Sequence, residues 1–503
     1  MKLTIGFFSN FRIGFFLLVA GLVFGGCQNN QSSQSGITGN ADQQQPNIVF
    51  ILADDLGWAD LPSYGNSFNE APNITRLANQ GMQFNNAYAA NPVCSPTRAS
   101  IQAGQYPARL GINDFIPGHW RPYEKVTVPT NDTQYLPGDI TTIAEALKEA
   151  GYATGYFGKW HLGSEQQHQP SSQGYDDSHV YAGGGYYDSN FRPEITPEPE
   201  GRLSEILTDR SLAFMEANSN RPFFLFLSHF DVHVQLDADK ELIEKYLDKE
   251  NSSTYPGNAV YAAMIEHIDQ SVGRVMDKLE QLGIDENTMV VFFSDNGGLI
   301  SRFDKIPLIA QNSLSYYEDN PLQYVASSNA PLRGEKGTIY EGGIREPLIV
   351  QWPGNIPAGT TSDALVSSID FYPTFLELAG AELPENQVVD GKSIVPALLE
   401  NKFDPQRPMY WHYPVYHHDV PAGAVRKGDW KLVENQVTGE VKLYNLEYDI
   451  SESTDMKQWY PEKKEELYGL LKDWQKNVNA DLPTPNPDFD PEKRYIWGTH
   501  PDR

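Results

Sequence analysis

The sequence predicts an α/β fold followed by a smaller C-terminal domain, and three observations support this prediction. Continuous apolar runs, typical of strands buried on both faces, alternate with segments of helical periodicity. Beyond about residue 390 the alternation gives way to short segments typical of antiparallel strands, followed by one helical segment. At 503 residues, of which 40% are hydrophobic, the chain is long enough for one large domain and one smaller domain. We expect the large domain at 46–390 and the smaller one at 391–503.

The apolar runs give the expected strands in chain order, and the expected helices lie between them. Thr142 and Glu145 match a capping box at the start of one helix, and Asn73 is the expected N-cap of another. The expected strands of the large domain are 48–53, 152–157, 222–228, 289–293 and 348–352, and its clearest helices are 73–81, 141–150 and 259–282. In the smaller domain we expect strands at 431–433 and 441–444, a helix at 465–474, and a proline-rich tail from 483 that wraps the surface.

The first 45 residues are expected to precede the folded domains. Lys2 and Arg12 precede an apolar run at 13–24 that is too short to span a bilayer. This arrangement is typical of a secretory signal peptide, which we expect at 1–26. Small residues stand before Cys27, as in a bacterial lipoprotein processing site, so Cys27 is a candidate lipid anchor; simple signal cleavage is the alternative. The polar residues 27–45 predict a flexible tether. We therefore expect export to the periplasm or the outer-membrane surface of a bacterium, with membrane attachment only through Cys27.

Charge and cysteine content narrow the functional classes. The net charge is −28, and −30 once residues 1–26 are removed, which excludes nucleic acid as a partner. Any site for an anion must therefore be locally basic. The chain has two cysteines, and Cys27 lies in the processing site, so we expect Cys94 to have no disulfide partner within the chain.

Oxygen-bearing side chains follow two of the expected strands. Asp54 and Asp55 come directly after strand 48–53, and Asp295 and Asn296 come just after strand 289–293. Open α/β sheets bind ligands beyond the carboxyl ends of their strands, so we expect these four side chains to lie together. Adjacent strand residues point to opposite faces, so both aspartates reach one ion only if the chain bends sharply. Oxygen ligands favour Ca²⁺ or, less strongly, Mg²⁺ over zinc; a simple Asp-Asn-Gly turn is the alternative.

Three further segments carry candidate catalytic groups. Cys94 stands one residue before an expected helix start, where the helix N-terminus and Arg98 favour negative charge on the residue at position 94. Lys159 and His161 are two residues apart and would share a face in extended chain. Lys336 lies in a loop rich in glycine and basic residues that could cradle an oxyanion. On these residues alone, a free loop cysteine, a solvated lysine, a structural histidine and a solvated basic turn remain alternatives.

Taken together, these segments resemble the type I, formylglycine-dependent sulfatases, an arylsulfatase-like branch of the alkaline phosphatase superfamily. The resemblance runs from about residue 46 to about 488, and its most specific element is Cys-x-Pro-x-Arg at 94–98, the family's maturation signal. The segments 158–163, 294–298 and 332–337 stand around it in the family's order. The resemblance implies an alkaline phosphatase-like fold: a large mixed central sheet flanked by helices, plus a C-terminal domain with a short antiparallel sheet and a helix.

The resemblance also implies the chemistry. A separate formylglycine-generating enzyme would oxidise Cys94 to formylglycine (3-oxoalanine), which hydrates to a geminal diol. One hydroxyl would attack sulfur and expel the alcohol, which leaves a covalent sulfate hemiester; deprotonation of the other hydroxyl would then eliminate sulfate and restore the aldehyde. The implied ligands of the Ca²⁺ ion are Asp54, Asp55, modified Cys94, Asp295 and Asn296.

The family pattern assigns a role to each remaining candidate. Arg98 and Lys159 would secure the hydroxyls of the modified residue, and His161 would take the proton in the elimination step. Lys336 and His233 would bind the sulfate oxygens, and one of them would assist the leaving group. In one departure from the pattern, valine stands before His233, where the family often has proline. In another, Glu335 replaces a commoner small residue and predicts an extra negative charge near the sulfate.

The expected export suggests a bacterial enzyme acting on sulfated polysaccharides or their oligosaccharides. Sugar sites use aromatic platforms and polar groups; the candidates, for which packing or surface roles are the alternative, are His119, Trp120, Trp411, His412, Tyr413, His417 and His418. The His417-His418 pair lacks a third spaced ligand and is not expected to bind a metal. One alternative function is a phosphoester or phosphonate hydrolase with the same site. Another is a non-catalytic surface glycan-binding protein with an unmodified Cys94.

Overall fold

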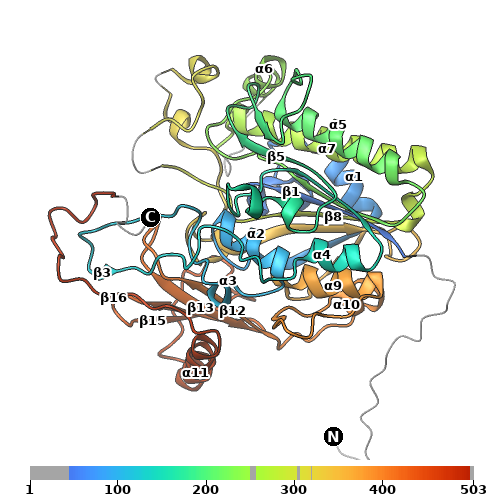
Figure 1. Cartoon of the computed structure of the whole chain (residues 1–503). Helices are drawn as coiled ribbons and strands as arrows, with labels where there is room; N and C mark the ends of the chain where they lie inside the picture. The colour runs from blue at the N-terminus through green and yellow to red at the C-terminus, as the bar shows by residue number, and fades with distance from the viewer. Residues whose placement is uncertain (1–44, 250–255, 303–305, 319, 499–503) are drawn as a thin grey trace, which may run out of the picture. The chain divides into compact units, whose positions relative to one another are not determined.

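The computed structural model describes residues 45–249, 256–302, 306–318 and 320–498 (Figure 1). The predicted signal peptide at 1–26, Cys27 and all but the last residue of the predicted tether lie outside the described residues. Among the residues described, no helix combines the length and apolar character needed to cross a bilayer.

A ten-stranded mixed sheet forms the centre of the fold. β1 (Asn47–Ala53) lies between β7 (Phe223–Ser228) and β8 (Thr288–Ser294), parallel to both, and β4 (Ala153–Gly158) continues the parallel part beside β7. The other strands of this sheet are β2 (Met82–Tyr88), β5 (Asp177–Gly183), β6 (Asn190–Arg192), β9 (Arg345–Gln351), β10 (Thr360–Ser362) and β11 (Val366–Ser367). β9 pairs antiparallel with both β8 and β2. The α/β fold with a large mixed sheet is therefore confirmed.

Helices cover both faces of this sheet because alternate side chains of β1 point to opposite sides. Val49 and Ile51 pack into a core with α1 (Pro72–Gln80), α5 (Leu203–Asn218) and α7 (Ala259–Leu282). Phe50 and Leu52 pack on the other face with α2 (Cys94–Ala103), α4 (Ile143–Glu149) and α9 (Phe371–Ala379). Figure 1 shows these two helical layers with β1 and β8 between them. The remaining helices on this part of the chain are α3 (Pro107–Leu110), α6 (Lys240–Leu247), α8 (Glu341–Ile344) and α10 (Val395–Glu400).

Two of the predicted helix starts can be compared with the structure. The capping box of α4 is present: Thr142 Oγ1 accepts from Glu145 N at 3.1 Å, and a Glu145 carboxylate oxygen accepts from Thr142 N at 2.8 Å. Asn73, however, is not the N-cap of α1. That helix begins at Pro72, whose fixed φ suits a first helical position, and Asn73 donates instead to Asp269 on α7 at 2.8 Å.

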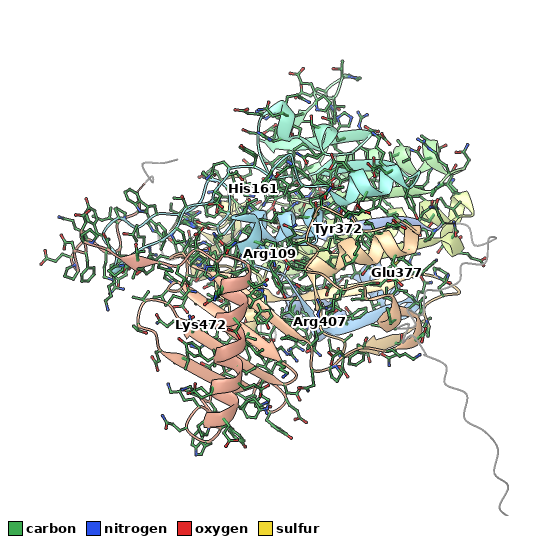
Figure 2. All side chains as sticks on the ribbon, turned by 60° about the horizontal axis from the view of Figure 1, so that its bottom comes forward. Arg109, His161, Tyr372, Glu377, Arg407 and Lys472 are labelled. Carbon is green, nitrogen blue, oxygen red and sulfur yellow. The ribbon has the colours of Figure 1, made fainter. Side chains whose placement is uncertain are left out.

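The C-terminal part forms the expected antiparallel sheet with a helix packed on it. Its strands, in spatial order, are β12 (Pro408–Tyr413), β13 (Ala422–Lys427), β14 (Trp430–Asn435) and β15 (Val441–Asn445), and its helix is α11 (Pro461–Asn477). Arg407, labelled in Figure 2, lies just before β12 and forms a two-point ion pair with Asp370 at the start of α9, at 2.6 and 2.7 Å. This buried pair ties the small sheet to the central layers. The domain boundary near residue 390 stays a prediction.

Short segments complete the structure. The tail after α11 returns along a distant loop, where β16 (Thr484–Pro485) pairs with β3 (Val126–Thr127). The 3₁₀ helices are Trp58–Asp60, Pro62–Tyr64, Gln166–His168, Pro170–Ser172, Asp285–Asn287, Leu314–Tyr317, Pro321–Tyr324 and Ser368–Asp370.

Candidate active site

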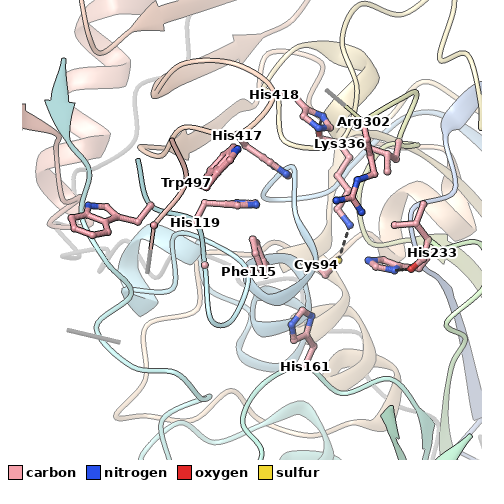
Figure 3. A pocket seen from close by; sticks show the side chains of 15 residues that line it. Cys94, Phe115, His119, His161, His233, Arg302, Lys336, His417, His418 and Trp497 are labelled. Atoms are coloured by element: carbon pink, nitrogen blue, oxygen red, sulfur yellow. Dashed lines mark hydrogen bonds between the residues drawn. The ribbon is translucent and has the colours of Figure 1, made fainter. Parts of the chain in front are cut away.

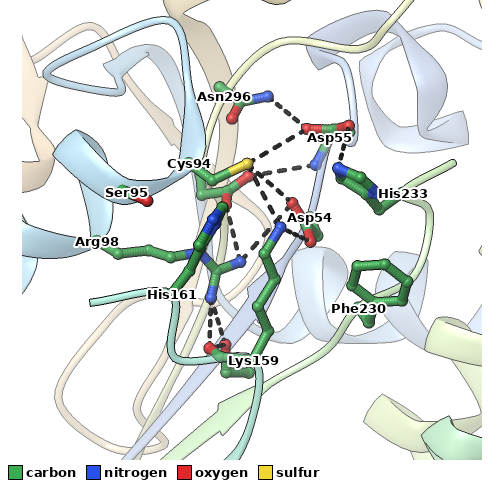
Figure 4. Close-up of polar contacts among 12 residues, drawn as sticks. Asp54, Asp55, Cys94, Ser95, Arg98, Lys159, His161, Phe230, His233 and Asn296 are labelled. Carbon is green, nitrogen blue, oxygen red and sulfur yellow. Dashed lines mark hydrogen bonds and ion pairs between the residues drawn. The ribbon is translucent and has the colours of Figure 1, made fainter. Parts of the chain in front are cut away.

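The carboxyl ends of β1 and β8 bring the predicted acidic residues next to Cys94. The two strands are in register, with Ala53 opposite Ser294, so the residues that follow each strand emerge side by side. Asp55 has a left-handed backbone (φ 61°), which provides the bend that the sequence analysis required. As a result both carboxylates face the thiol: Cys94 Sγ lies 3.5 Å from Asp54 Oδ1 and 3.9 Å from Asp55 Oδ1 (Figure 4).

Two lysines approach the same sulfur atom from different loops. Lys159, just after β4, places Nζ 2.5 Å from Asp54 Oδ2 and 3.4 Å from Cys94 Sγ. Lys336 places Nζ 2.8 Å from Asp55 Oδ2 and 3.5 Å from the same Sγ. All five side chains are nearly inaccessible to solvent. Position 94 is therefore surrounded by two carboxylates and two ammonium groups in a buried environment, where such charges interact strongly.

Arg98 lies beneath this group on the first turns of α2. Its guanidinium donates to Asp295 Oδ2 at 2.9 Å, to the Lys159 carbonyl at 2.7 Å and to Ser228 Oγ at 2.7 Å. Arg98 therefore compensates the charge of Asp295 and holds the end of β4 in place. α2 begins at Cys94 itself, not one residue later as expected.

His161 reaches the site by a route that the sequence analysis did not anticipate. Its backbone is left-handed (φ 60°), so Lys159 and His161 do not share a face of extended chain, and that expectation is wrong. Its Nε2 lies 2.6 Å from the carbonyl of Ile116, which can only accept, so Nε2 carries the proton. Nδ1 is buried without a hydrogen-bond partner among the described residues. Burial and the charge of Lys159 hold the pKa of His161 well below its ordinary value, so this ring is neutral.

His233 lies beside Asp55, near the same carboxylate oxygen that Lys336 contacts. Its Nε2 is 3.7 Å from Asp55 Oδ2, and its side chain keeps 24% exposure. Burial, together with the charges of Lys159 and Lys336, lowers the pKa of His233 to about 3. His233 is therefore a neutral ring at the edge of the cluster.

Burial and the neighbouring charges shift the pKa values of Asp55, Asp295 and Cys94 in different directions. Burial raises the pKa of Asp55, but Lys336 and the neighbouring cations outweigh burial and hold it well below its ordinary value. Burial and the charge of Asp54 raise the pKa of Asp295 to about 6. Burial raises the pKa of the Cys94 thiol above its ordinary value despite the two lysines. In unmodified Cys94, burial therefore outweighs the nearby cations, and this thiol is a weak nucleophile.

The donor set suits a hard divalent cation. Asp54, Asp55, Cys94 and His233 place ligand-capable atoms within 4.8 Å of one another. Asn296 donates through Nδ2 to Asp55 Oδ1 at 2.8 Å, while its Oδ1 is buried without a hydrogen-bond partner among the described residues. An unpartnered buried oxygen beside two carboxylates is the environment that an oxygen-seeking cation would complete. His233 joins this group without having been predicted as a ligand.

Cys94 lies at the floor of a cavity of about 460 Å³ (Figure 3). Four of the predicted sugar-contacting residues line it: His119, Trp120, His417 and His418. The floor is buried, whereas residues farther out are partly exposed. The volume falls within the range of small-molecule sites and exceeds what a sulfate group alone requires.

Three of the predicted sugar-contacting residues are instead structural. Trp411 is buried and donates to the Ala89 carbonyl at 2.8 Å. His412 bonds to the Asp481 carbonyl at 2.7 Å, and Tyr413 bonds to Asp114 and to the pocket residue His417. All three are held in β12, whereas His417 and His418 follow that strand in a loop that can reach the cavity.

Among the pocket residues that the sequence analysis missed, three have aromatic or cationic side chains. Phe115 and Arg302 line the cavity from loops, and Trp497 lines it from the C-terminal tail. An arginine soon after the 294–298 segment, in a strongly acidic chain, was a signal that could have been used for Arg302. For Trp497 no periodicity or spacing connects the tail to the site.

The loop that carries Lys336 is fixed by close contacts with its neighbours. Glu335 accepts from the backbone of Ile300 at 2.7 Å and lies 3.6 Å from Nδ1 of His418, so its carboxylate stands next to a residue of the pocket wall. Gly337 has φ 78°, and a Cβ atom there would come 2.0 Å from Nδ1 of His417. Glycine is required at 337 for both reasons.

A second buried charge group lies behind this loop. Lys431 on β14 places Nζ 2.9 Å from Glu341 Oε1 and 2.9 Å from Glu452 Oε1. Glu452 also accepts from Glu341 N at 2.7 Å, and its carbonyl accepts from Arg333 at 2.9 Å. This Lys431 cluster connects the small sheet to both ends of the segment that carries Lys336.

Comparisons with known proteins agree with one another. A family model described as Sulfatase matches residues 46–381, and a model described as N-sulphoglucosamine sulphohydrolase, C-terminal, matches residues 334–479. A sulfatase of Formosa agariphila is 34% identical and aligns with 82% of this chain and 84% of its own length. The N-acetylgalactosamine-6-sulfatase of Sus scrofa is also 34% identical, over 75% of this chain and 70% of its own.

A solved structure is similar over most of the chain. The structure of Ps i-CgsB in complex with k-i-k-neocarrahexaose has a TM-score of 0.72 and 29% identity, covering 89% of this chain and 95% of that one. The likeness therefore extends over most of both chains.

Proposed function

The chain belongs to the sulfatase family and is a sulfuric ester hydrolase, and we propose that it removes O-sulfate from sulfated polysaccharides or their oligosaccharides. The observation that carries this proposal is the position of Cys94, at the buried floor of a cavity between two carboxylates and two lysines. The related proteins named for N-acetylgalactosamine-6-sulfate hydrolysis and for a neocarrahexaose complex support a sugar sulfate as the substrate.

Cys94 is proposed to act as formylglycine, made by a separate formylglycine-generating enzyme. The Cys-x-Pro-x-Arg segment at the start of α2 supports this, as does the raised pKa of the thiol, which makes unmodified Cys94 a weak nucleophile. The hydrated aldehyde would supply a hydroxyl nucleophile for the sulfate ester. Lys159 and Lys336, each within about 3.5 Å of Sγ, stabilise negative charge on an oxygen at this position.

A Ca²⁺ ion, with Mg²⁺ less favoured, is proposed to be held by Asp54, Asp55, Asp295, Asn296 and the modified residue 94. When bound, such an ion would act as a Lewis acid toward the sulfate and the nucleophile. The unpartnered Oδ1 of Asn296 supports this ligand set. Arg98 keeps Asp295 ionised and oriented within it.

Three side chains are proposed to act directly on the substrate. His161 lines the cavity and has an unprotonated Nδ1 without a hydrogen-bond partner among the described residues, so it accepts the proton from the hydroxyl at position 94 as sulfate is eliminated. The charge of Asp55 outweighs burial and raises the pKa of Lys336, so Lys336 stays positively charged and binds the sulfate oxygens. His233 also lines the cavity, 3.7 Å from the Asp55 oxygen that Lys336 contacts, and binds the sulfate together with Lys336.

Export is part of the proposal. The signal-like segment at 1–26 and the processing-site pattern at Cys27 support a periplasmic or surface lipoprotein. That location would give the enzyme access to extracellular glycans too large to enter a cell.

The direct test is sulfate release by enzyme co-produced with a formylglycine-generating enzyme. The panel contains 6-sulfated N-acetylgalactosamine oligosaccharides, neocarra-oligosaccharides and sulfated glucosamine, with 4-nitrophenyl phosphate and bis(4-nitrophenyl) phosphate as comparators. Release from one glycan series supports the proposal and identifies the substrate. Phosphoester hydrolysis without sulfate release contradicts it, and an intact thiol in tryptic peptide 77–98 of the active enzyme contradicts the proposed modification.

A further inference from the structure

The C-terminal tail contributes to the wall of the cavity that contains Cys94. Trp497 and Gly498 line this cavity, although they are more than 400 residues from Cys94 in the sequence. The two family models end at 381 and 479, so this part of the wall lies outside the region that the chain shares with them. A pocket wall built from such a segment is suited to distinguishing substrates within the family.

The tail is held in place along its length by the loop that contains β3. β16 pairs with β3, and Asn486 donates through Nδ2 to the carbonyls of Pro122 and Glu124 at 2.8 and 2.7 Å. Gly498 N donates to the Trp120 carbonyl at 3.0 Å. Since the loop itself supplies His119 and Trp120 to the cavity, the tail and the loop form one continuous wall.

Trp497 is the large aromatic side chain that the tail adds to this wall. Its ring lies 4.8 Å from the His119 ring, and the Arg121 guanidinium lies over it at 4.0 Å. The His119 ring in turn lies 4.2 Å from that of His417. Figure 3 shows Trp497, His119 and His417 together on one side, with His233 and Arg302 on the other.

The depth of these residues separates two parts of the cavity. Cys94 and Lys336, on the floor, are 1% and 9% exposed, whereas Trp497 is partly exposed and Gly498 is exposed. A sulfate held at the floor directs its alcohol outward, toward the rim formed by the tail. An indole at the rim offers a flat apolar surface, which complements the C–H face of a pyranose ring.

We propose that Trp497 forms a subsite for the sugar ring that neighbours the sulfated one, so that the tail makes the enzyme selective for oligomeric glycans over small sulfate esters. This inference rests on the proposed function. Arg121 and His119 act as positioning residues that fix the plane of the indole. The neighbouring ring adds binding energy that a small aryl sulfate cannot provide.

The test compares Trp497→Ala with the matched control Tyr495→Ala. Tyr495 lies on the same tail, is 69% exposed and is not part of the cavity wall. For each protein, kcat/KM is measured on 4-nitrophenyl sulfate and on a sulfated tetrasaccharide. The tetrasaccharide is taken from the series that the parent enzyme desulfates, either 6-sulfated chondroitin or neocarra-oligosaccharide. Trp497→Ala should lower the ratio of tetrasaccharide to aryl sulfate kcat/KM about tenfold, mainly through KM, because one aromatic contact is lost. Trp497→Phe should restore part of the ratio, and Tyr495→Ala should leave it unchanged.

A binding measurement removes any dependence on maturation. In a Cys94→Ser background made without the formylglycine-generating enzyme, Trp497→Ala should weaken tetrasaccharide binding about tenfold by calorimetry. Equal ratios and equal affinities for Trp497→Ala and its parent would overturn the subsite while leaving the proposed function intact. If the parent enzyme, carrying formylglycine and no substitution, released sulfate from none of the glycans, both the proposed function and the subsite would be wrong.

Discussion

The buried charges around Cys94 and those of the Lys431 cluster use the same kinds of side chain for different purposes. In the Lys431 cluster, every carboxylate oxygen of Glu341 and Glu452 has a hydrogen-bond or ion-pair partner within the chain: Lys431, Arg345, Tyr88 or a backbone N–H, with Glu452 Oε1 held by its ion pair to Lys431. In the group around Cys94, the acceptor atoms Asn296 Oδ1 and His161 Nδ1 are buried without hydrogen-bond partners among the described residues.

This difference in the pairing of buried acceptor atoms shows that buried charge alone does not identify a functional site. Both groups shift pKa values: Lys431 and Arg345 outweigh burial and lower the pKa of Glu341 to about 2, while burial raises that of Glu452 to about 7. What distinguishes the group around Cys94 is unused hydrogen-bonding capacity next to a cavity. Internal pairing indicates a structural role, and unused capacity facing a cavity indicates a ligand.

The largest expected effect comes from removing the proposed nucleophile. Cys94→Ala should lower sulfate release by at least about a thousandfold, because nothing else at the floor of the cavity can form the covalent intermediate. The thermal unfolding midpoint should change little, since only one small buried side chain is altered. Appreciable activity in this variant, measured on the best glycan of the panel, would show that formylglycine is not used here.

Breaking the Lys431 cluster should act on stability instead. Lys431→Met leaves the carboxylates of Glu341 and Glu452 buried without their shared cation, so the free energy of unfolding should fall by about 3–5 kcal/mol. The control is Lys442→Met on the neighbouring strand β15, where the half-exposed side chain should contribute less than about 0.5 kcal/mol. Denaturant unfolding measures both, and equal small losses would refute the structural role.

The effect of Ca²⁺ on stability should depend on the group around Cys94 and not on the Lys431 cluster. At a hundredfold excess over its Kd, Ca²⁺ should raise the free energy of unfolding by about 2.7 kcal/mol, and a chelator should reverse this gain. Asn296→Ala should reduce the shift, because the unpartnered oxygen is lost, whereas Lys431→Met should retain it. If Ca²⁺ did not change the free energy of unfolding, the proposed ligand set would be contradicted.

The smallest expected effect concerns the departure at position 335. Glu335→Ser removes the acceptor of the Ile300 and Ser301 N–H groups, which should cost about 1 kcal/mol of stability. It also removes a negative charge 3.6 Å from His418, so KM for a sulfated glycan should decrease slightly. Differential scanning calorimetry and steady-state kinetics test these two effects; an increase in KM would mean that Glu335 contacts the sugar.

The sequence was most informative where local pattern determines structure. α7 was predicted at 259–282 and occupies those residues, because a long amphipathic pattern between an Asn cap and a glycine defines both ends. The buried strands were recognised because they are apolar on both faces. The convergence of Asp54, Asp55, Asp295 and Asn296 followed from the rule that parallel strands end at one edge of a sheet.

Tertiary contacts account for what the sequence analysis missed. The left-handed backbone of His161 and the contacts of Arg98 depend on neighbours distant in the chain. Trp411 was predicted to contact sugar because it is an aromatic residue, but its position in β12 directs its side chain toward the Ala89 carbonyl. Trp497 reaches the cavity only because the tail pairs with β3, and no local pattern encodes that pairing.

The contact between Gly337 and His417 bears on how substrate preference can change in this enzyme. Because His417 fills the space beside the Gly337 backbone, the wall that faces the sugar and the loop that holds the sulfate-binding lysine share one surface. Neither can be exchanged alone in a chimera: a grafted loop with a different residue at 417 would meet a backbone shaped for histidine. Recombination between relatives would therefore have to transfer both segments as a single unit.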